Sequence, residues 1–382
     1  MFYLDRAATT PVRREVLEAM WPWLTGGFGN PSSTHGLGDQ AARGLSAARG
    51  QVAEVLGCRP GEVVFTAGGT EGANTAVKGI ALAAPRGRHV VTSAIEHEAV
   101  LESCRYLERF HGFAVTVLPV DSTGRVDPDV LAAALRPDTT LVSVAHADNE
   151  VGTVQDLPVL GAVARSVGAR FHTDAVQSAP WLPVGLDVLG VDALSFSGHK
   201  LGAPKGTGVL VVRSGVPVEP LVHGGGQERG RRSGTEDVAG AVAVSTALAL
   251  AAAGRSDSAT QATATRDAVI AGVLHEVPSA LVTGSLDHRL PGHASFCFPG
   301  VTGETVLLEL ERRDVVSSSG SACAAGSTEA SHVLTALGLS EDVARSAVRL
   351  TFDATLSAAD VPLVVRAVAE AVSTVRAMRW VY

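Results

Sequence analysis

The stretch Ser195-Phe-Ser-Gly-His-Lys200, which continues into the glycine-rich Gly202-Ala-Pro-Lys-Gly-Thr-Gly208, places a lysine directly after an apolar predicted strand. A lysine bonds covalently to a carbonyl group only when its amine loses its proton, which a desolvated position or a neighbouring cation favours. The chain has 382 residues and 31 lysines and arginines, yet Lys78, Lys200 and Lys205 are its only lysines. A surface lysine after a strand is the ordinary interpretation. The scarcity of lysine and the flanking serine, histidine and glycine residues favour a chemical role for Lys200.

The predicted strand before Lys200 belongs to a regular alternation of strands and helices in the first two thirds of the chain. Short β-branched runs predict strands at 63–66, 89–93, 114–118, 141–145, 170–173, 193–197 and 208–213. Helical periodicity lies between most of them, at 70–82, 98–110, 128–135 and 157–167. This alternation predicts an α/β fold with a mainly parallel, seven-stranded sheet and helices on both faces. Ligands of such sheets bind at the carboxyl ends of the strands.

The chain changes character after the apolar, alanine-rich segment 238–253, which we expect to be a buried helix. A polar, helix-compatible stretch at 254–265 follows, and later strands are predicted at 295–298, 315–317 and 348–352. We therefore expect a large domain over residues 15–257. Residues 1–14 and 258–382 are expected to form a smaller α+β domain.

Composition excludes several classes of protein. The net charge of −8 argues against direct nucleic-acid binding and against a membrane-surface protein, because both need a basic field. The N-terminus lacks a signal-peptide pattern, and segment 238–253 is too short and too weakly apolar to span a bilayer. The four cysteines are far apart, without a C-x-x-C pair, which fits neither a disulfide framework nor a zinc site. We expect a cytoplasmic protein without a bound metal.

Three further motifs follow predicted strands. In the stretch Gly68-Gly-Thr70 the glycines let main-chain N–H groups approach a phosphate, and Thr70 is expected to cap the next helix. Asp174, with Gln177 three residues later, suits a protonated heterocyclic nitrogen, and His97 could stack on a flat ring or move a proton. Taken singly, the Gly68–Thr70 stretch is equally typical of an ordinary strand-to-helix turn, Asp174 of a helix N-cap, and His97 of a structural histidine. Together with Lys200 they match what pyridoxal 5'-phosphate requires.

Cys323 differs from the other cysteines in its surroundings. It lies in the Ser/Gly/Ala-rich stretch Ser317-Ser-Ser-Gly-Ser-Ala-Cys-Ala-Ala-Gly326, for which we expect a flexible loop and an accessible thiol. Cys58, Cys104 and Cys297 lie in helix-like or strand-like contexts and are expected to act as small core residues.

At these residues the sequence resembles the cysteine desulfurases, which are pyridoxal-phosphate enzymes of the class V aminotransferase fold. The matching motifs are Tyr3-Leu-Asp5, Ala7-Ala-Thr-Thr-Pro11, Gly29-Asn-Pro-Ser-Ser33, Thr70-Glu71 with Asn74, Glu96-His97, Asn149-Glu-Val-Gly152, Asp174-Ala175 with Gln177-Ser178, Ser195-Phe-Ser-Gly-His-Lys200, His223-Gly-Gly-Gly-Gln-Glu-Arg229, Arg232-Ser-Gly-Thr235 and Ser319-Gly-Ser-Ala-Cys323. They extend over nearly the whole chain. The long stretch between Cys323 and Ser331-His-Val-Leu334 resembles the branch with an extended catalytic loop.

The resemblance implies a role for each matched residue. Lys200 would hold the cofactor as a Schiff base and move protons, His97 would stack on the ring and assist proton transfer, and Cys323 would be the nucleophile. The other implied contacts are Asp174 with the ring nitrogen, Gln177 with the ring oxygen, Gly69, Thr70, Ser197 and His199 with the phosphate, Thr235 with the phosphate of the neighbouring subunit's cofactor, Asn149 with cofactor or substrate, and Arg349 with the substrate carboxylate. Such shared sites imply a homodimer.

The reaction that the resemblance implies converts L-cysteine to L-alanine and leaves the sulfur as a persulfide on Cys323. An acceptor protein would receive that sulfur for iron–sulfur cluster assembly, tRNA thiolation or DNA phosphorothioation. A selenocysteine lyase or another class V pyridoxal-phosphate enzyme would share most cofactor residues. A sulfur-relay scaffold with a merely structural cofactor is the alternative from a different class.

The sequence departs from the family pattern at three places. Asp148 precedes Asn149-Glu150 where many members carry a second asparagine, so a new carboxylate lies near the site. Gly72-Ala73 replaces a Ser-Asp pair, and the residues after Arg349 lack the usual Ser-Leu-Gly.

Overall fold

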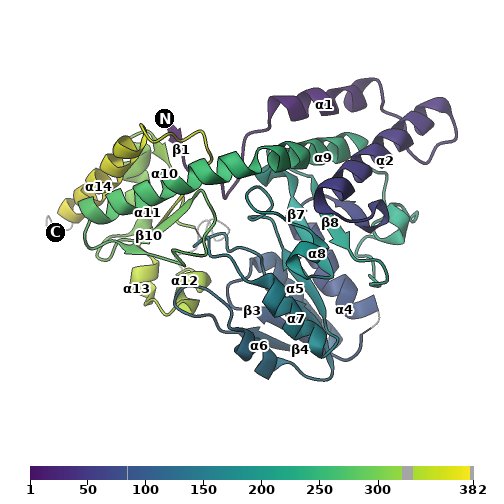
Figure 1. The fold of residues 1–382 in the computed structure, drawn as a ribbon, viewed down its shortest axis with the longest axis horizontal. Coiled ribbons are helices and arrows are strands. Elements are labelled where there is room, and N and C mark those ends of the chain that lie inside the picture. Colours follow the sequence, from purple (N-terminus) through teal and green to yellow (C-terminus); the bar gives the residue numbers. More distant parts are fainter. Residues whose placement is uncertain (84, 321–329, 379–382) are drawn as a thin grey trace.

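The computed structural model of the chain describes residues 1–83, 85–320 and 330–378, so the predicted nucleophile Cys323 lies outside the described residues. Figure 1 shows a larger part built around a sheet and a smaller part beside it, connected by the helices α9 (Val238–Ala253) and α10 (Arg255–Glu276). The two helices are bent by 67° at their junction. The bend falls at Gly254, where the alanine-rich segment gives way to the polar one.

A seven-stranded sheet forms the centre of the larger part. Its strands, in spatial order, are β2 (Val63–Thr66), β8 (Gly208–Val212), β7 (Ala193–Ser197), β6 (Arg170–Asp174), β5 (Thr139–Ser143), β3 (His89–Ser93) and β4 (Ala114–Leu118). Strand β8 is antiparallel to β2 and β7, and every other pair is parallel. The prediction of a mainly parallel seven-stranded sheet is confirmed. The strand predicted at 141–145 begins and ends two residues earlier.

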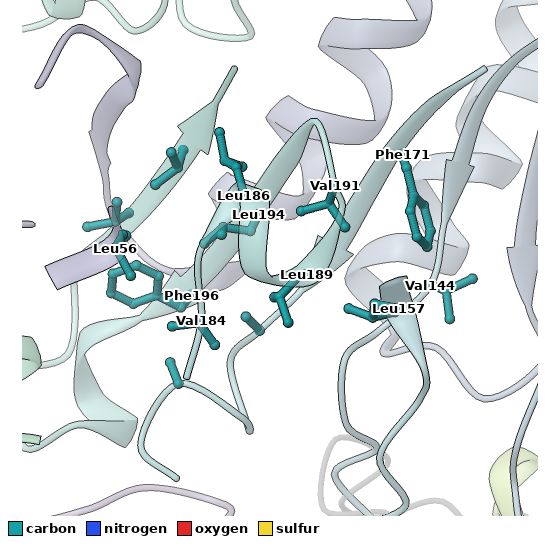
Figure 2. Close-up of a cluster of buried hydrophobic side chains, with 14 of the residues drawn as sticks. Leu56, Val144, Leu157, Phe171, Val184, Leu186, Leu189, Val191, Leu194 and Phe196 are labelled. Atoms are coloured by element: carbon teal, nitrogen blue, oxygen red, sulfur yellow. The ribbon is translucent and has the colours of Figure 1, made fainter. Parts of the chain in front are cut away.

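Helices cover both faces of this sheet because its strands are apolar on both sides. Val63 and Val211 pack into the core on one face, whereas Val64 and Leu210 pack into the core on the other, as alternation along a strand requires. The first face is covered by α1 (Arg14–Thr25), α2 (Gly36–Leu56), α6 (Pro128–Ala134), α7 (Leu157–Ser166), α8 (Leu186–Leu189) and α9. The second is covered by α5 (Glu98–His111) and by a continuous segment made of α3 (Gly69–Asn74), a π-helical turn (Thr75–Gly79) and α4 (Ile80–Ala83). Figure 2 shows part of the first core, where Phe171 and Phe196 contribute the largest side chains.

Helix α9 has the bounds that the sequence predicts, and most of its residues are buried, so the prediction of a buried alanine-rich helix is confirmed. Within the described ranges no single helix is both long and apolar enough to cross a membrane. In that part of the chain, only α9 and α10 taken together, as a bent pair, meet the test of length and composition.

The smaller part combines residues from both ends of the chain. An antiparallel sheet is formed by β12 (Ala347–Thr351), β10 (His293–Cys297) and β9 (Leu281–Val282), and a parallel pair by β1 (Phe2–Tyr3) and β11 (Val315–Val316). The accompanying helices are α10, α11 (Gly303–Glu311), α12 (His332–Ala336), α13 (Glu341–Ala344) and α14 (Val361–Met378). The predicted division into domains at residues 14 and 257 stays a prediction.

Strand direction decides where the chemical residues of the larger part gather. Strands β2 and β7 are both antiparallel to β8, so they run in the same direction as β3, β5 and β6. The carboxyl ends of all five therefore lie at one edge of the sheet. The loops that follow them carry the motifs singled out from the sequence.

Candidate functional site

A cavity of about 380 Å³ lies at this edge of the sheet. Its lining includes the predicted site residues Gly69, Thr70, His97, Asn149, Asp174, Gln177, Ser197, His199, Lys200 and Arg349. The remaining lining residues are Ala7, Ala8, Ile95, Ala145, Ala147, Asp148, Val176 and Gly320. Of the other predicted site residues, Thr235 lies on an exposed loop before α9 and is not part of this lining, and Cys323 lies outside the described residues.

Lys200 ends a short 3-10 turn that directly follows β7, which brings its side chain to the cavity. Its Nζ donates hydrogen bonds to the main-chain carbonyl oxygens of Ala7 and Ala8, the latter at 2.5 Å. The Gln177 side chain also donates to the Ala7 oxygen, at 3.0 Å. The N-terminal segment is therefore a wall of the cavity. Sequence reasoning missed this, because main-chain oxygens leave no signal beyond the Ala7-Ala-Thr-Thr-Pro11 motif itself.

His97 and Asp174 are each fixed by a local main-chain hydrogen bond. His97 is the N-cap of α5, and its Nδ1 accepts from the Ala99 N–H at 3.0 Å, so the neutral ring carries its proton on Nε2. Asp174 is buried, and its Oδ1 accepts from the Val176 N–H at 2.8 Å. Burial raises the pKa of Asp174, while His97 and Lys200 act to lower it. Such a carboxylate favours a cationic partner in the cavity.

A hollow at the start of α3 has the donors that a phosphate needs. Its lining includes Gly68, Gly69, Thr70, Ser197, His199 and Lys205. Glu71 also lines it and is paired with Arg232 at 3.1 Å. Helix α3 begins at Gly69 with Gly68 as N-cap and without a side-chain cap, so the expectation that Thr70 caps the helix is wrong.

Two of the residues around this hollow are constrained by their surroundings. A Cβ on Gly69 would lie 2.6 Å from Val176 Cγ2, which explains the glycine. His199 lies within hydrogen-bonding distance of Thr9 Oγ1, at 3.1 Å from its Nδ1. Burial lowers the pKa of His199 to about 4, helped by Lys200 and Lys205. The ring is therefore neutral near pH 7.

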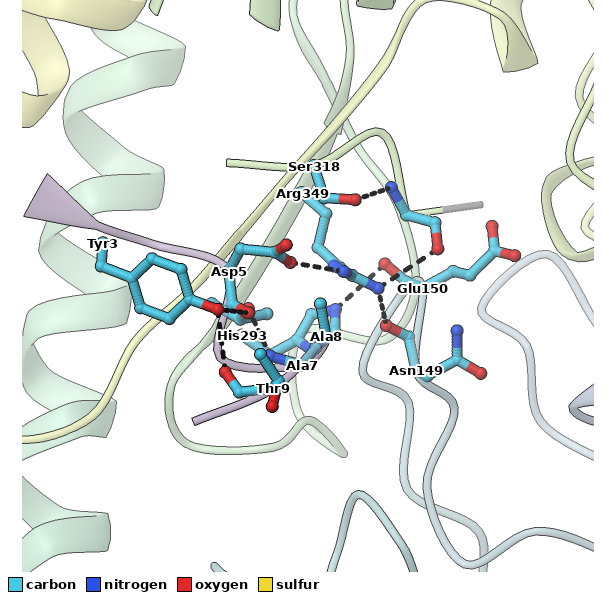
Figure 3. Close-up of polar contacts among 12 residues, drawn as sticks. Tyr3, Asp5, Ala7, Ala8, Thr9, Asn149, Glu150, His293, Ser318 and Arg349 are labelled. Atoms are coloured by element: carbon cyan, nitrogen blue, oxygen red, sulfur yellow. Dashed lines mark hydrogen bonds and ion pairs between the residues drawn. The ribbon is translucent and has the colours of Figure 1, made fainter. Parts of the chain in front are cut away.

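Arg349, on β12, also lines the cavity, and Figure 3 shows its polar contacts, including the one with Asp5 of the N-terminal segment. Its side chain is 2% exposed. The Nη2 donates to Asp5 Oδ1 at 2.7 Å, and Nη1 donates to the carbonyl oxygens of Asn149 at 2.8 Å and Gly320 at 3.2 Å. Its Nε has no hydrogen-bond partner among the described residues. A buried guanidinium with an unused donor is suited to an anionic ligand.

Two buried acids belong to the loops of the site: Asp148 lines the cavity, and Glu96 precedes the lining residue His97. Asp148 Oδ1 accepts from the main-chain N–H groups of Glu150 at 2.8 Å and Val151 at 2.6 Å, and its Oδ2 has no partner among the described residues. Burial and the neighbouring Glu150 raise the pKa of Asp148 to about 7. Glu96 accepts from Ser93 Oγ at 2.5 Å, and burial raises its pKa to about 8. The Asp148 departure noted from the sequence thus lines the cavity, whereas nothing in the Glu96-His97 motif signals the burial of Glu96.

The described cysteines are poor nucleophiles. Cys104 and Cys297 are buried and Cys58 is half-buried, and none forms a disulfide. Burial raises the pKa of Cys58 to about 11, and the pKa of Cys104 and of Cys297 to about 12, so their thiols stay protonated near pH 7. The expectation of a core environment is confirmed for Cys104 and Cys297, while Cys58 packs at the edge of the core. In the part of the chain that the structure describes, no cluster of metal-ligating side chains is placed to hold an ion.

Known proteins resemble this chain along almost its whole length. The profile of the Aminotransferase class-V family matches residues 2–364. The cysteine desulfurase IscS of Dictyoglomus turgidum is 45% identical over 350 residues, which cover 91% of this chain and 89% of that protein. A solved NifS-like protein matches with a TM-score of 0.90 at 36% identity, covering 98% of this chain and 99% of that one. The structure of SspA in complex with cysteine matches with a TM-score of 0.81 at 38% identity, covering 92% and 99%.

Proposed function

This chain belongs to the aminotransferase class-V family and is a cysteine desulfurase, and from that premise we propose that it moves the sulfur of L-cysteine onto Cys323 and releases L-alanine. The observation that carries the proposal is the single cavity lined by Lys200, Asp174, His97 and Arg349. One amine, one buried carboxylate, one imidazole and one guanidinium are the groups that amino-acid chemistry on pyridoxal phosphate requires.

The donor set fits pyridoxal 5'-phosphate as the cofactor. Thr70, Ser197 and the neutral His199 would hold its phosphate with main-chain N–H groups of the 68–70 turn, because these residues line one hollow. Asp174 would hold the ring nitrogen, since its burial favours a cationic partner, and Gln177 would contact the ring oxygen. When bound, the cofactor draws electrons away from the α-carbon of an attached amino acid.

The residues around the cofactor site would have separate roles in substrate binding and in proton transfer. Arg349 would bind the α-carboxylate through its unused donor, and Asn149 would contact the cofactor or substrate from the adjoining loop. The Lys200 amine, which would also hold the cofactor, would take and return the α-proton. His97 would stack on the ring and assist proton transfer from Nε2, because its Nδ1 already accepts from Ala99.

Cys323 would take the sulfur as a nucleophile. Its thiolate would attack the sulfur of cysteine, forming a sulfur–sulfur bond as the carbon–sulfur bond breaks, and the electron pair left on carbon would be protonated to give alanine. Gly320 lines the cavity three residues before Cys323, and three residues span at most about 11 Å. The high thiol pKa values of Cys58, Cys104 and Cys297 disfavour them as substitutes.

A homodimer is the proposed assembly. The N-terminal helix region carries several large apolar side chains on its surface, among them Trp21 at 65% exposed and Phe28 at 67% exposed. A second subunit would cover such a surface, and it would also give the exposed Thr235 a role at the partner's phosphate site. The free thiols suit the reducing cytoplasm, which is the proposed location.

The test is to incubate the purified, cofactor-loaded protein with L-cysteine and to measure alanine and protein-bound persulfide together. We expect equal amounts in the first turnover, loss of both in Cys323→Ala, and retention of both in Cys58→Ala, which removes a thiol away from the cavity. Alanine production without persulfide on Cys323 would contradict the proposal. Loss of sulfide release in Cys323→Ala with selenium release from selenocysteine retained would instead identify a selenocysteine lyase.

The sulfur acceptor can be identified with the same persulfide. The purified protein is first incubated with radiolabelled cysteine, small molecules are then removed, and the protein is mixed with candidate acceptors. Label should be transferred only to the acceptor that is its partner. The candidates are the acceptors of iron–sulfur cluster assembly, tRNA thiolation and DNA phosphorothioation.

A further inference from the structure

The N-terminal segment, residues 2–10, contacts both Arg349 and Lys200, and Figure 3 shows its contact with Arg349. At its start, β1 pairs with β11 in the smaller part. At its end, the Thr10 N–H donates to the carbonyl oxygen of His199 at 3.0 Å, and the carbonyl oxygens of Ala7 and Ala8 accept from Lys200. Asp5 lies between these two anchors.

Strand register brings Asp5 to Arg349 across 344 residues of sequence. Asp5 forms a parallel β-bridge with Thr351, and Arg349 precedes Thr351 by two residues on β12. Residues two apart on a strand point to the same face, so Arg349 and Asp5 are diagonal neighbours. The resulting ion pair joins Asp5 Oδ1 and Arg349 Nη2 at 2.7 Å.

The donors of Arg349 can be accounted for one by one. A guanidinium has five N–H groups. The two N–H groups on Nη1 donate to the carbonyl oxygens of Asn149 and Gly320, and one N–H on Nη2 donates to Asp5 Oδ1. Nε is buried and has no partner among the described residues, and the described contacts use one of the two N–H groups on Nη2. These are the two donors of Arg349 that the described residues leave unused, and Asp5 is the ion-pair partner that the described part of the chain supplies to this buried cation.

Asp5 is held firmly enough to position its partner. The Ala7 N–H donates to Thr351 Oγ1 at 2.9 Å, the Arg6 N–H donates to the Thr351 carbonyl oxygen at 3.1 Å, and the Tyr3 hydroxyl donates to the Asp5 carbonyl oxygen at 3.1 Å. The side chain of Asp5 is 18% exposed. These bonds hold the backbone of Asp5 against β12, within reach of Arg349.

We infer that Asp5 is a positioning residue for substrate recognition: it holds Arg349 by one Nη2 hydrogen, so that Nε and the other Nη2 hydrogen receive the α-carboxylate of the amino acid. The inference rests on the proposed role of Arg349. It goes beyond that role because it makes recognition of the carboxylate depend on a residue of the N-terminal segment that need not touch the substrate.

The test compares a ligand with a carboxylate, L-alanine, and one without, cysteamine. Both are titrated into the cofactor-loaded protein, and dissociation constants are read from the visible spectrum. In Asp5→Asn we expect L-alanine to bind about tenfold more weakly and cysteamine to bind unchanged, because only a carboxylate uses Arg349. In the reaction, KM for cysteine should rise more than kcat falls. Asp5→Glu, which keeps the charge on a longer side chain, should lie between the native protein and Asp5→Asn.

Asp353→Asn is the matched control. Asp353 pairs with Arg6 at 2.9 Å and so fastens the same segment near the same strand, but it does not line the cavity with Arg349. We expect both ligands to bind this variant as they bind the native protein. A loss of L-alanine affinity equal to that in Asp5→Asn would mean that the segment acts only as a structural clamp, and would overturn the inference.

Arg349→Gln separates failure of the inference from failure of the proposed function. If Arg349→Gln leaves the preference for L-alanine over cysteamine intact, the role of Arg349 is wrong and the inference falls with it. If Arg349→Gln removes the preference while Asp5→Asn keeps or strengthens it, the role of Arg349 stands and only the inference about Asp5 is overturned.

Discussion

The two walls of the cavity are built in different ways. The sheet wall, formed by Thr70, His97, Asp174, Ser197 and Lys200, consists of residues that come at or soon after strand ends of one sheet. The N-terminal wall, formed by Ala7, Ala8 and Arg349 and supported by the Asp5 that pairs with Arg349, depends on contacts between residues 193 and 344 positions apart. Local geometry thus places the groups that would bind cofactor, whereas long-range pairing places the group that would bind the substrate carboxylate. Changes in the sheet wall should mainly alter turnover, and changes in the N-terminal wall should mainly alter ligand preference.

The largest effect is expected from Lys200→Ala in the sheet wall. It removes the amine that would hold the cofactor and move the α-proton, so kcat should fall by about a thousandfold or more. The visible spectrum of the loaded protein should change as well. Lys78→Ala is the matched control, since Lys78 lies 4.9 Å from the centre of the Tyr106 ring, away from the cavity lining. An unchanged spectrum in Lys200→Ala would favour the scaffold alternative, in which the cofactor is structural.

Asp174→Asn should have the second largest effect. The amide keeps the shape and can still accept from the Val176 N–H, but it removes the charge that would hold a protonated ring nitrogen. We expect kcat to fall about a hundredfold, with less than about a threefold change in the preference for L-alanine over cysteamine. A large change in that preference with kcat intact would contradict the division between the two walls.

The fold and the sheet wall could be predicted because their signals are local. A strand followed by small or polar residues places those residues at the ligand edge of a parallel sheet, whatever the rest of the chain does. The errors are local too. The strand predicted at 141–145 ends at Ser143, since the Ala145 N–H donates to the Glu96 side chain at 2.9 Å instead of to a neighbouring strand. Thr70 is not the N-cap, because the helix begins at Gly69 with Gly68 as its N-cap.

The N-terminal wall could not be derived in the same way. Arg349 was assigned only through a family resemblance, because a lone arginine in a strand has no pattern that marks it as a binding residue. Its pair with Asp5 requires the register between the first residues of the chain and β12, which no periodicity in either segment encodes. The contacts of Ala7 and Ala8 with Lys200 use carbonyl oxygens, which every residue has.

Glu96→Gln tests the stability of the sheet wall. The pKa of Glu96 is raised to about 8 from its ordinary 4.5, so its contribution to stability is full below pH 4.5 and is lost as the pH rises to about 8. The glutamine cannot ionise in the unfolded state. The difference in unfolding free energy, variant minus native, should therefore be more than about 1 kcal/mol larger at pH 8 than at pH 4.5. Denaturant titrations at both pH values measure this difference. An equal difference at both would show that Glu96 ionises in the folded protein as easily as in water.

The smallest effect is expected from Asp148→Asn, at the junction of the two walls. Asp148 precedes Asn149, whose carbonyl oxygen accepts from Arg349, and its own Oδ2 is buried without a partner among the described residues. Because the pKa of Asp148 is raised to about 7 by burial and by Glu150, its carboxyl gains a negative charge as the pH rises through 7. That charge should oppose the carboxylate that Arg349 would bind.

The pH dependence of ligand preference isolates this effect. Between pH 6 and pH 8 the preference of the native protein for L-alanine over cysteamine should fall about threefold, and in Asp148→Asn it should stay level, since the amide does not titrate. Glu96 and Glu150 also interact with Asp148, and burial raises the pKa of each. They are unchanged in the variant, so the difference between the two profiles reports Asp148. Parallel profiles would mean that the charge of Asp148 does not reach the carboxylate site, and that the two walls are electrostatically separate.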